Sequence, residues 1–399
     1  MSADDVSGVD DYIRAYSVAY SADAPIPAWA RKYNMTCNMC HSPAAPRLNA
    51  MGIRFRWAGY RMPSELGTKV DVGDLSDYVS MRGRVRYDYR KTSDQPVSKS
   101  SFGFHDATLF FAGPYGKGYS AFFELEREAE DDIGLTAHIA SAWGNEKSYG
   151  GFRVGLMHWL LRDGVAGFDR PTGIATPTPL ANPLSATIPF RFSKDQLGLE
   201  AYYVSGSNRV SAEILNGVNS SGSGGGADFD TRKDFVVTDQ LLLDNSGSGL
   251  TAVGYYGTIV GLDASEPTLS SHYWRLGLSV NKFIKHFEVI AGGVYGKDRD
   301  LPAVVSAADT KAFGFWGQVQ YMFTELFPES ALTLFGRYEF VDPNTDVDDN
   351  ANTRIVAGSV LPVNLPEYLR LALEYTLDSP QLSGAPKTHG ITAEVMLNF

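Results

Sequence analysis

The feature that most constrains the fold is a strict alternation of apolar and polar residues, which begins near residue 79 and recurs to the end of the chain. In VSMRGRVRYDYR, Val79, Met81 and Val85 alternate with charged residues such as Arg82 and Arg84. A two-residue period is that of a β-strand with one apolar and one polar face. The pattern therefore predicts strands that meet an apolar medium on one side only.

Sixteen segments alternate in this way, and each has about the length that a tilted strand needs to cross a bilayer. They lie near residues 79–90, 103–113, 118–128, 133–143, 151–161, 195–205, 208–218, 233–243, 249–260, 272–281, 286–296, 312–323, 330–341, 352–362, 367–377 and 388–399. The links after odd-numbered segments are mostly longer than those after even-numbered ones, as in bacterial outer-membrane barrels. We predict a mainly β chain whose residues 79–399 form a 16-stranded antiparallel transmembrane β-barrel, because a soluble sandwich or propeller would bury the apolar faces.

Composition argues against one class of function, nucleic-acid binding, and it does not exclude a membrane protein. The chain has 46 Asp and Glu against 35 Lys and Arg, a net charge of -11, so we expect no nucleic-acid partner. It has no apolar run long enough for a membrane-spanning helix. Its first twenty residues have neither the basic start nor the apolar core of a secretory signal; we expect that a signal has been removed from the chain shown.

A different pattern stands near the start, in KYNMTCNMCHSPAAPRLNAMG. Cys37 and Cys40 are the only two cysteines, and His41 follows directly. A zinc site would need a second pair of ligands, and a thioredoxin-like pair would need a βαβ context. The Cys-x-x-Cys-His pattern instead matches a covalently attached haem c, with both thiols bonded to the haem and the histidine on the iron.

The residues after the motif predict a short helix from Pro46 to Gly59, with one apolar face packed on the haem. Gly52 is costly in a helix, and we interpret it as a close approach of backbone to the porphyrin. For the second axial ligand of the iron we favour Met62, in the loop after the helix, over Met51 on the helix itself. Both could equally be packing residues, and a barrel histidine or no protein ligand remain alternatives.

We divide the chain into a flexible extension (1–25), a monohaem cytochrome c domain (26–70), a linker (71–78) and the barrel (79–399). A barrel of about sixteen strands has a lumen wide enough for a plug. An apolar band about 25 Å tall would insulate a haem held on one side of it from the other side. We therefore expect the small α-helical cytochrome domain to lodge inside the barrel lumen.

This combination resembles a known family. The stretches PAWARKYNMTCNMCH and PRLNAMGIRFRWAGY, ahead of a sixteen-strand porin, resemble the fused monohaem cytochrome c-porins of the outer membrane, which have been proposed as Fe(II) oxidases. The resemblance implies one haem c on Cys37 and Cys40, ligated by His41, and no catalytic residue beyond the haem. It also implies an outer-membrane electron conduit in a Gram-negative bacterium, with the haem domain reached from the periplasm.

The donor implied by the resemblance is extracellular Fe(II), and the acceptor is a periplasmic c-type cytochrome or another soluble carrier. Such a protein would be an Fe(II)-oxidising oxidoreductase. Hard cations prefer oxygen ligands, so the outward acidic loop with Glu128, Glu130, Asp131 and Asp132 is a candidate attractor for Fe(II), although solvated loop charge explains it as well.

Other functions remain open at this stage. The chain could be a porin for anions or other solutes, in which the haem domain serves as a plug or redox sensor, or a conduit for a donor or acceptor other than iron. Arg82, Arg84, Arg86 and Arg90 should face the lumen, where they could pair with haem propionates or with acidic barrel residues. An oligomer is possible, since porins are often trimers.

Overall fold

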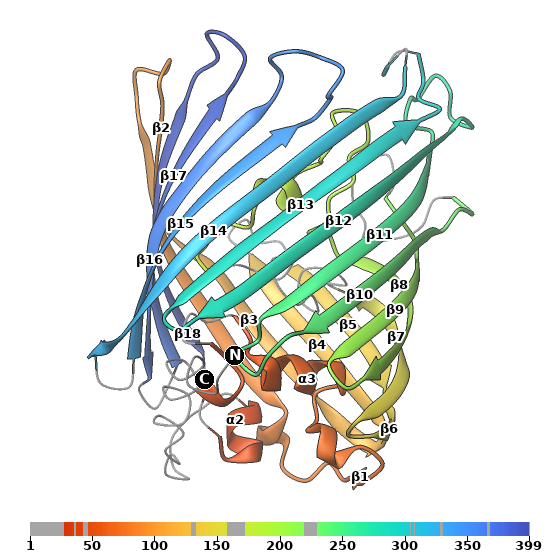
Figure 1. Ribbon diagram of the computed structural model, residues 1–399, viewed down its shortest axis with the longest axis vertical. Coiled ribbons are helices and arrows are strands. Elements are labelled where there is room, and N and C mark those ends of the chain that lie inside the picture. Colours follow the sequence, from red (N-terminus) through yellow and green to blue (C-terminus); the bar gives the residue numbers. More distant parts are fainter. Residues whose placement is uncertain are drawn as a thin grey trace.

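The computed structural model describes residues 28–35, 37–42, 47–128, 133–157, 172–218, 230–303, 305–306, 308–327, 330–364 and 368–398, and they form a closed β-barrel with short helices at one end (Figure 1). Within these residues, sixteen long antiparallel strands follow one another around the wall in sequence order. The first of them, β2 (Val79–Thr92), pairs with the last, β18 (Thr388–Asn398), which closes the barrel.

Between these two, the wall consists of β3 (Lys99–Lys117), β4 (Tyr119–Glu128), β5 (Ile133–Ser141), β7 (Ser148–Met157), β8 (Gln196–Ser205), β9 (Asn208–Leu215), β10 (Asp234–Leu242), β11 (Gly249–Val260), β12 (Ser270–Ile284), β13 (Phe287–Arg299), β14 (Thr310–Phe327), β15 (Ser330–Asp342), β16 (Asn352–Asn364) and β17 (Tyr368–Pro380). A short strand, β6 (Trp143–Asn145), continues β5 and pairs with β7. The predicted 16-stranded antiparallel barrel is thus confirmed.

One strand boundary that differs from the prediction is the start of β7, which lies at Ser148 rather than near residue 151. The side chain of Asn145 accepts hydrogen bonds from the backbone N–H groups of Lys147 (3.0 Å) and Ser148 (3.2 Å). This Asx turn reverses the chain at once, so pairing with β6 starts immediately after it.

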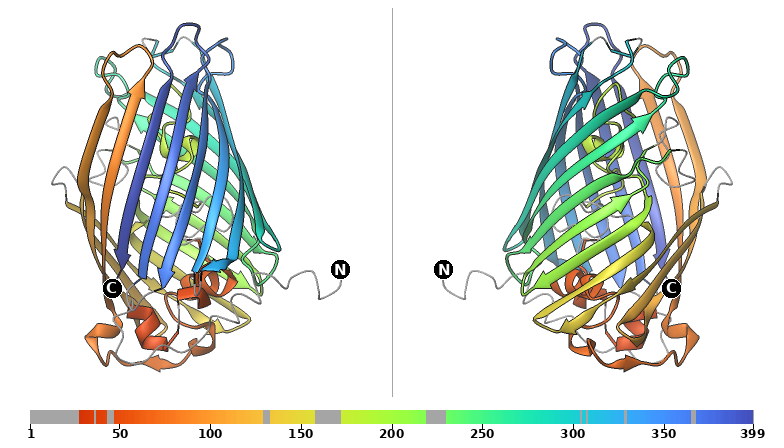
Figure 2. Two further views of the ribbon diagram at one scale, coloured as in Figure 1. Left: turned by 90° about the vertical axis from the view of Figure 1, so that its left-hand side faces the viewer. Right: turned by 90° about the vertical axis from the view of Figure 1, so that its right-hand side faces the viewer.

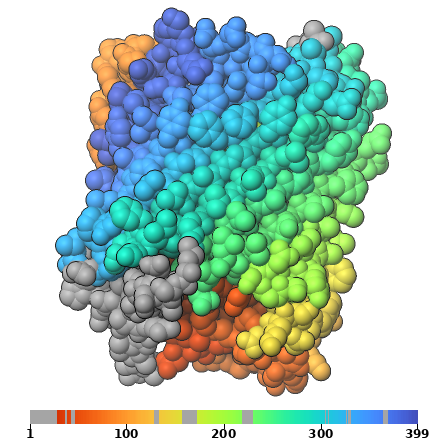
Figure 3. Space-filling model, viewed as in Figure 1, coloured from red at the N-terminus to blue at the C-terminus, as the bar shows by residue number. Residues whose placement is uncertain are grey.

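The two faces of the wall differ as the alternation predicted. Large apolar side chains such as Phe152, Leu278 and Leu373 are exposed on the outside, whereas inward neighbours such as Arg153 and Glu374 are buried. Figure 3 shows the outer surface of β10 to β14 as a continuous band above the N-terminal segment. An apolar outer band of this kind is the surface that lipid contacts in a transmembrane barrel. Separately, no helix in the described part of the chain is long and apolar enough to span a membrane.

The N-terminal segment lies at the end of the barrel where the turns are short (Figures 1 and 2). It contains α2 (Ala28–Tyr33), η2 (Cys37–Met39), α3 (Ala50–Trp57), η3 (Pro63–Glu65), β1 (Lys69–Val70) and η4 (Leu75–Asp77). The helix α3 begins at Ala50 rather than near Pro46, because Asn49 caps it: its side chain accepts from the Gly52 N–H at 3.0 Å. Pro46 itself lies outside the described residues.

Contacts on several sides hold this segment inside the mouth of the barrel. The Trp57 indole donates to Gln240 of β10 (3.0 Å), and the Tyr60 hydroxyl lies 3.3 Å from His138 Nε2 on β5. Across the mouth, the buried Arg47 forms an ion pair with the buried Glu288 of β13. Breaking a buried pair of this kind by removing one partner typically costs about 3–5 kcal/mol, so the segment is firmly docked.

A second piece of chain fills the lumen further up. Residues 172–195, which follow β7, fold inward and include the short helix α4 (Thr178–Ala181), visible inside the barrel in both views of Figure 2. Leu180, Phe190 and Phe192 are fully buried and pack against inward-facing side chains of the wall, among them Tyr255 and Trp316. The lumen therefore contains a hydrophobic core where a porin would hold water.

Candidate functional site

The Cys-x-x-Cys-His motif forms a single helical turn. The backbone N–H groups of Cys40 and His41 both donate to the carbonyl of Cys37, at 3.2 and 3.0 Å. In a helical turn, residues three and four apart lie on the same face. The two thiols and the imidazole thus arise from one side of the turn, as attachment to a single haem requires.

The start of α3 holds this turn in place. The Asn49 N–H donates to the Cys40 carbonyl (3.0 Å), and the Asn49 side-chain amide donates to the Met39 carbonyl (3.1 Å). A Cβ added to Gly52 would stand 2.2 Å from the Cys40 oxygen. The close approach expected at Gly52 is therefore present, but in the described residues its partner is the backbone of the turn, and this contact alone requires glycine here.

Replacing Gly52 with Ala tests this packing, because alanine is the better helix former by about 1 kcal/mol. We expect the clash with the Cys40 carbonyl to outweigh that gain and to destabilise the docked turn by roughly 1–3 kcal/mol. Limited proteolysis of the N-terminal segment would measure the change. The matched control is Gly73→Ala, whose new Cβ meets no atom within 4 Å; equal resistance of both variants to proteolysis would contradict the argument.

Burial controls the chemistry of the two thiols. It raises the pKa of Cys37 to about 11 and that of Cys40 to about 12, the nearby Cys37 adding to the shift at Cys40. A thiolate, not a thiol, is the nucleophile and the usual metal ligand. At neutral pH both residues are therefore thiols that resist oxidation and alkylation.

In the haem-free protein, alkylation of these thiols by iodoacetamide should be slow at pH 8 and should accelerate through pH 11 as the thiolates form. The raised pKa also means that the folded state favours the neutral thiol over the thiolate. The resulting contribution to the free energy of unfolding is present below the unfolded pKa of about 8.5, and it is lost as the pH rises through 11. Mass spectrometry of alkylated protein, native against denatured, measures the rates. Equal rates in both states at pH 8 would be inconsistent with buried thiols.

One residue of the turn contacts the inner face of the barrel wall. The Cys37 side chain packs against Met396 on the inner face of β18. Met396 in turn lines a small, partly open pocket between β2, β17, β18 and the inward-folded segment. If a haem is bound, Cys37, Cys40 and His41 are the residues that would hold it.

The two methionines considered as the second axial ligand lie in different surroundings from Cys37. Met62 packs into an aromatic cluster with Phe55, Tyr60 and Phe122. Met51 is partly exposed on α3, beside Gly52. The assignment of Met62, with Met51 as the alternative, stays a prediction.

The acidic loop lies largely beyond the part of the chain that the structure covers. Glu130, Asp131 and Asp132 are outside the described residues, and Glu128 is the last residue of β4, opposite Asp106 of β3 in the strand register. Their interpretation as attractors for Fe(II) stays a prediction.

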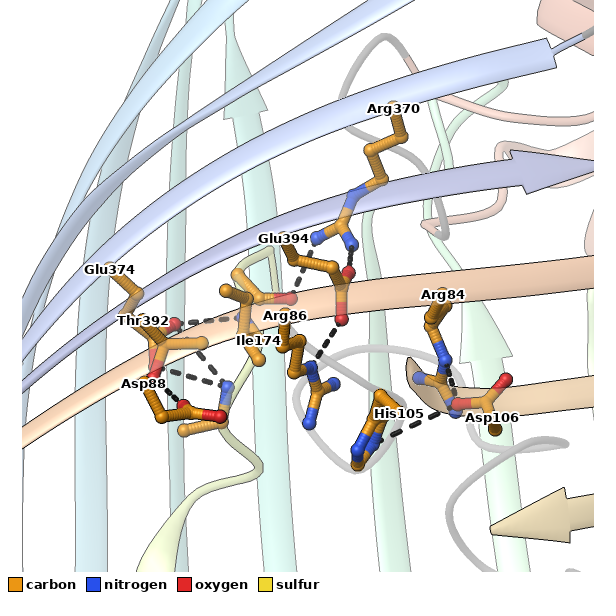
Figure 4. A network of polar contacts seen from close by, with 12 residues as sticks. Arg84, Arg86, Asp88, His105, Asp106, Ile174, Arg370, Glu374, Thr392 and Glu394 are labelled. Carbon is orange, nitrogen blue, oxygen red and sulfur yellow. Dashed lines mark hydrogen bonds and ion pairs between the residues drawn. The ribbon is translucent and has the colours of Figure 1, made fainter. Parts of the chain in front are cut away.

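The inner-wall arginines pair with acidic barrel residues, one of the two alternatives foreseen for them. Arg82 lies 2.7 Å from Glu126, and Arg84 forms an ion pair with Asp106 of β3. Arg86 lies 2.7 Å from Glu394 of β18, which Arg370 of β17 also contacts (Figure 4). Arg90, at the far end of β2, is exposed.

Sequence reasoning missed Met396 as a neighbour of the motif, and it missed the inward-folded segment around Ile174 with its partners Arg370 and Glu374. Arg370 donates to the Gly173 carbonyl at 2.8 Å, and Glu374 accepts from the Ile174 N–H at 2.8 Å. One signal was available: Tyr255 and Tyr273 on inward positions, with apolar residues on both faces of β11, indicate that something apolar fills the lumen.

Comparison with known proteins supports the barrel. No sequence family and no curated protein sequence matches the chain. Among solved structures, an anion-selective porin of Comamonas acidovorans matches with a TM-score of 0.54 at 14% identity, over 80% of this chain and 99% of that one. The barrel is porin-like.

Two further porin-like structures agree. The outer membrane protein OmpT of Vibrio cholerae matches with a TM-score of 0.52 at 11% identity, over 80% of this chain and 97% of the other. The outer membrane channel DcaP of Acinetobacter baumannii matches with a TM-score of 0.52 at 11% identity, over 84% and 100%. At such identities the likeness establishes the porin-like fold and nothing finer.

Proposed function

We propose that this protein is an outer-membrane electron conduit, built as a porin-like barrel whose lumen is closed by protein and whose periplasmic mouth holds one haem c. The observation that carries the proposal is the helical Cys37–His41 turn, docked inside the barrel with Cys37 against the wall residue Met396. A chain that merely exported a cytochrome would not need this docking.

The filled lumen supports the conduit over an open pore. The N-terminal segment contacts β5, β10 and β13 around the mouth. Above it, inward-facing side chains of the wall pack against Leu180, Phe190 and Phe192. Two protein layers in series leave little path for water and solutes through the barrel.

The chain's own residues would hold and shield the redox centre. A haem c bound here supplies a reversible one-electron carrier. Cys37 and Cys40 would attach it by thioether bonds, His41 would bind its iron, and Gly52 lets α3 press on the turn so that these three residues keep their positions. Trp57 and Tyr60 anchor the helix to the wall.

The barrel ends support an orientation with the N-terminal segment on the periplasmic side. The N-terminal segment lies at the end with short turns, such as residues 206–207 and 285–286, and short turns face the periplasm in outer-membrane barrels. A periplasmic cytochrome or another soluble carrier is therefore the partner we propose for the exit of electrons, with extracellular Fe(II) as the donor.

One experiment addresses the donor. Reoxidised, purified protein mixed with Fe(II) should show the absorption spectrum of a reduced c-type cytochrome, with one Fe(II) oxidised per haem. A general reductant such as dithionite serves as the control. Reduction by dithionite but not by Fe(II) would remove the iron-oxidase function and leave a conduit for another donor or acceptor.

A second candidate function is solute transport, and the structural comparisons favour it, since the neighbours described above are porins or channels. In this alternative the docked segment acts as a plug or redox sensor. Planar-bilayer conductance separates the two candidates: a large ion flux through the intact, haem-loaded protein would support the porin and overturn the conduit.

A further inference from the structure

The wall residue that contacts the motif is Met396 of β18, and its surroundings differ from those of an ordinary core methionine. Its side chain is buried on the inner face of the wall. In the strand register, Arg84 of β2 and Arg370 of β17 stand abreast of it, and both are buried as well. Among the described residues, Cys37 is the hydrophobic side chain that packs against it. Methionine usually fills gaps between apolar side chains, so packing does not explain its place in a charged row.

The chemistry of Met396 suits a position beside the motif. A methionine thioether is one of the side-chain groups that bind haem iron opposite a histidine. Cys37 would be bonded to the rim of the porphyrin that holds this iron, so a side chain in contact with Cys37 lies next to that ring. The three rotatable bonds of methionine let its sulfur adjust, while strand pairing on both sides fixes the Met396 backbone. The wall thus offers a suitable donor atom on a rigid base.

The contacts of the motif reach opposite sides of the barrel. His41 forms a β-bridge with Leu48. The Leu48 carbonyl oxygen lies so near the link between β10 and β11 that a Cβ added to Gly247 would stand 2.8 Å from it. In the strand order, β11 to β17 separate β10 from β18, so these two strands face each other across the lumen. The two axial ligands of one haem iron lie on opposite faces of the porphyrin. Here His41 is held from the β10 side, and Met396 approaches from the β18 side.

The methionine favoured from the sequence, Met62, has a packing role that accounts for it. It lies against a cluster formed by Phe55 and Tyr60 of the N-terminal segment and Phe122 of β4. This is the apolar environment in which methionine ordinarily serves as a gap-filler. Met396 has no comparable cluster among the described residues, since Cys37 is its hydrophobic partner there. Between the two, Met396 is the residue whose position calls for a role other than packing.

We propose that Met396 of the barrel wall, rather than Met62 of the N-terminal segment, is the second axial ligand of the haem iron, opposite His41. This assignment rests on the proposed function, because it requires a haem c attached to Cys37 and Cys40. It also gives the docking of the segment a chemical purpose. The segment supplies the two thiols and one iron ligand, and the barrel supplies the other ligand, so the ligand set is complete only when the segment is docked inside the barrel.

The test uses the full-length, haem-loaded protein and the variant Met396→Leu, a substitution that nearly conserves volume. The matched control is Met322→Leu, because Met322 is a buried wall methionine of β14 that packs with Phe283. Met62→Leu tests the competing ligand. Ferric haem with a methionine ligand has a weak absorption band in the far red. We expect this band in wild type, Met322→Leu and Met62→Leu, and its loss in Met396→Leu. The midpoint potential of Met396→Leu should also fall, since methionine ligation raises it.

A second variant guards against a merely structural effect. Met396→His should bind the iron through an imidazole, and we expect a low-spin spectrum without the far-red band and a potential below that of wild type. The heat-modified mobility of the barrel shows that each variant is folded.

The outcomes separate the ligand from the function. A far-red band that is missing from wild type, or that persists in Met396→Leu, overturns the assignment of Met396. Haem staining of denatured wild type shows whether haem is covalently attached, and its absence overturns the proposed function together with this ligand. A band that depends on Met396 in a protein that Fe(II) fails to reduce supports the ligand and removes only the iron-oxidase function.

Discussion

Replacing both Cys37 and Cys40 with Ala is expected to give a folded barrel that carries no covalently attached haem. The barrel should persist because the wall is closed by strand pairing that does not involve the two thiols. Haem staining after denaturing electrophoresis measures attachment, and the heat-modified mobility of the barrel measures folding.

A single-residue variant sharpens this experiment. His41→Ala keeps both thiols, so we expect haem to remain attached while the visible spectrum changes with the loss of an iron ligand. Haem that stays on the denatured Cys37→Ala, Cys40→Ala protein would contradict the assignment of the motif. Loss of the folded barrel in that variant would show instead that the turn is needed for assembly.

Removing both layers that fill the lumen should open the barrel to ions. We compare a variant in which a Gly-Ser linker replaces residues 175–192, a variant without residues 1–77, and the combination of the two. Because the layers lie in series, each single deletion should conduct little, whereas the double deletion should conduct on the order of tenfold more, as expected for a sixteen-stranded barrel with an aqueous lumen. Single-channel recording in planar bilayers measures this.

The control for replacing part of the chain by a linker is the same replacement of residues 382–386, in the exposed link between β17 and β18. It should leave conductance at the wild-type level. Large conductance after either single deletion would show that one layer alone seals the lumen. Large conductance of the intact protein would support solute transport instead of electron transfer.

The wall could be predicted from the sequence because each strand carries its own two-residue alternation, a local signal. The inward fold of residues 172–195 could not, because it depends on contacts such as Arg370 with Gly173 and Arg337 with Ala175, about 200 and 160 residues apart. Neither partner has a distinctive local pattern. The start of α3 was wrong for a local reason: the Asn49 cap competes with a proline that also suits a first helical turn.

For the candidate site, the motif identified Cys37, Cys40 and His41 without help from the fold, since its spacing carries the chemistry. Met396 became a neighbour of the motif only through the fold. Met62, the favoured candidate for the second axial ligand, shows that closeness in sequence does not fix closeness in space. It follows the helix directly, yet it packs with Phe55 and Tyr60 rather than beside Cys37.

The closure of the barrel by β2 and β18 has a consequence for the order of folding. The Arg86–Glu394 pair joins residues 308 positions apart, and the contact between Cys37 and Met396 spans even more of the chain. Contacts of such sequence separation form late, because the entropy of closing a long loop must be overcome first. The inner wall beside Cys37 is therefore completed only when the last strand meets the first, so a chain stalled before that step would leave the Cys37–His41 turn without its contact to Met396.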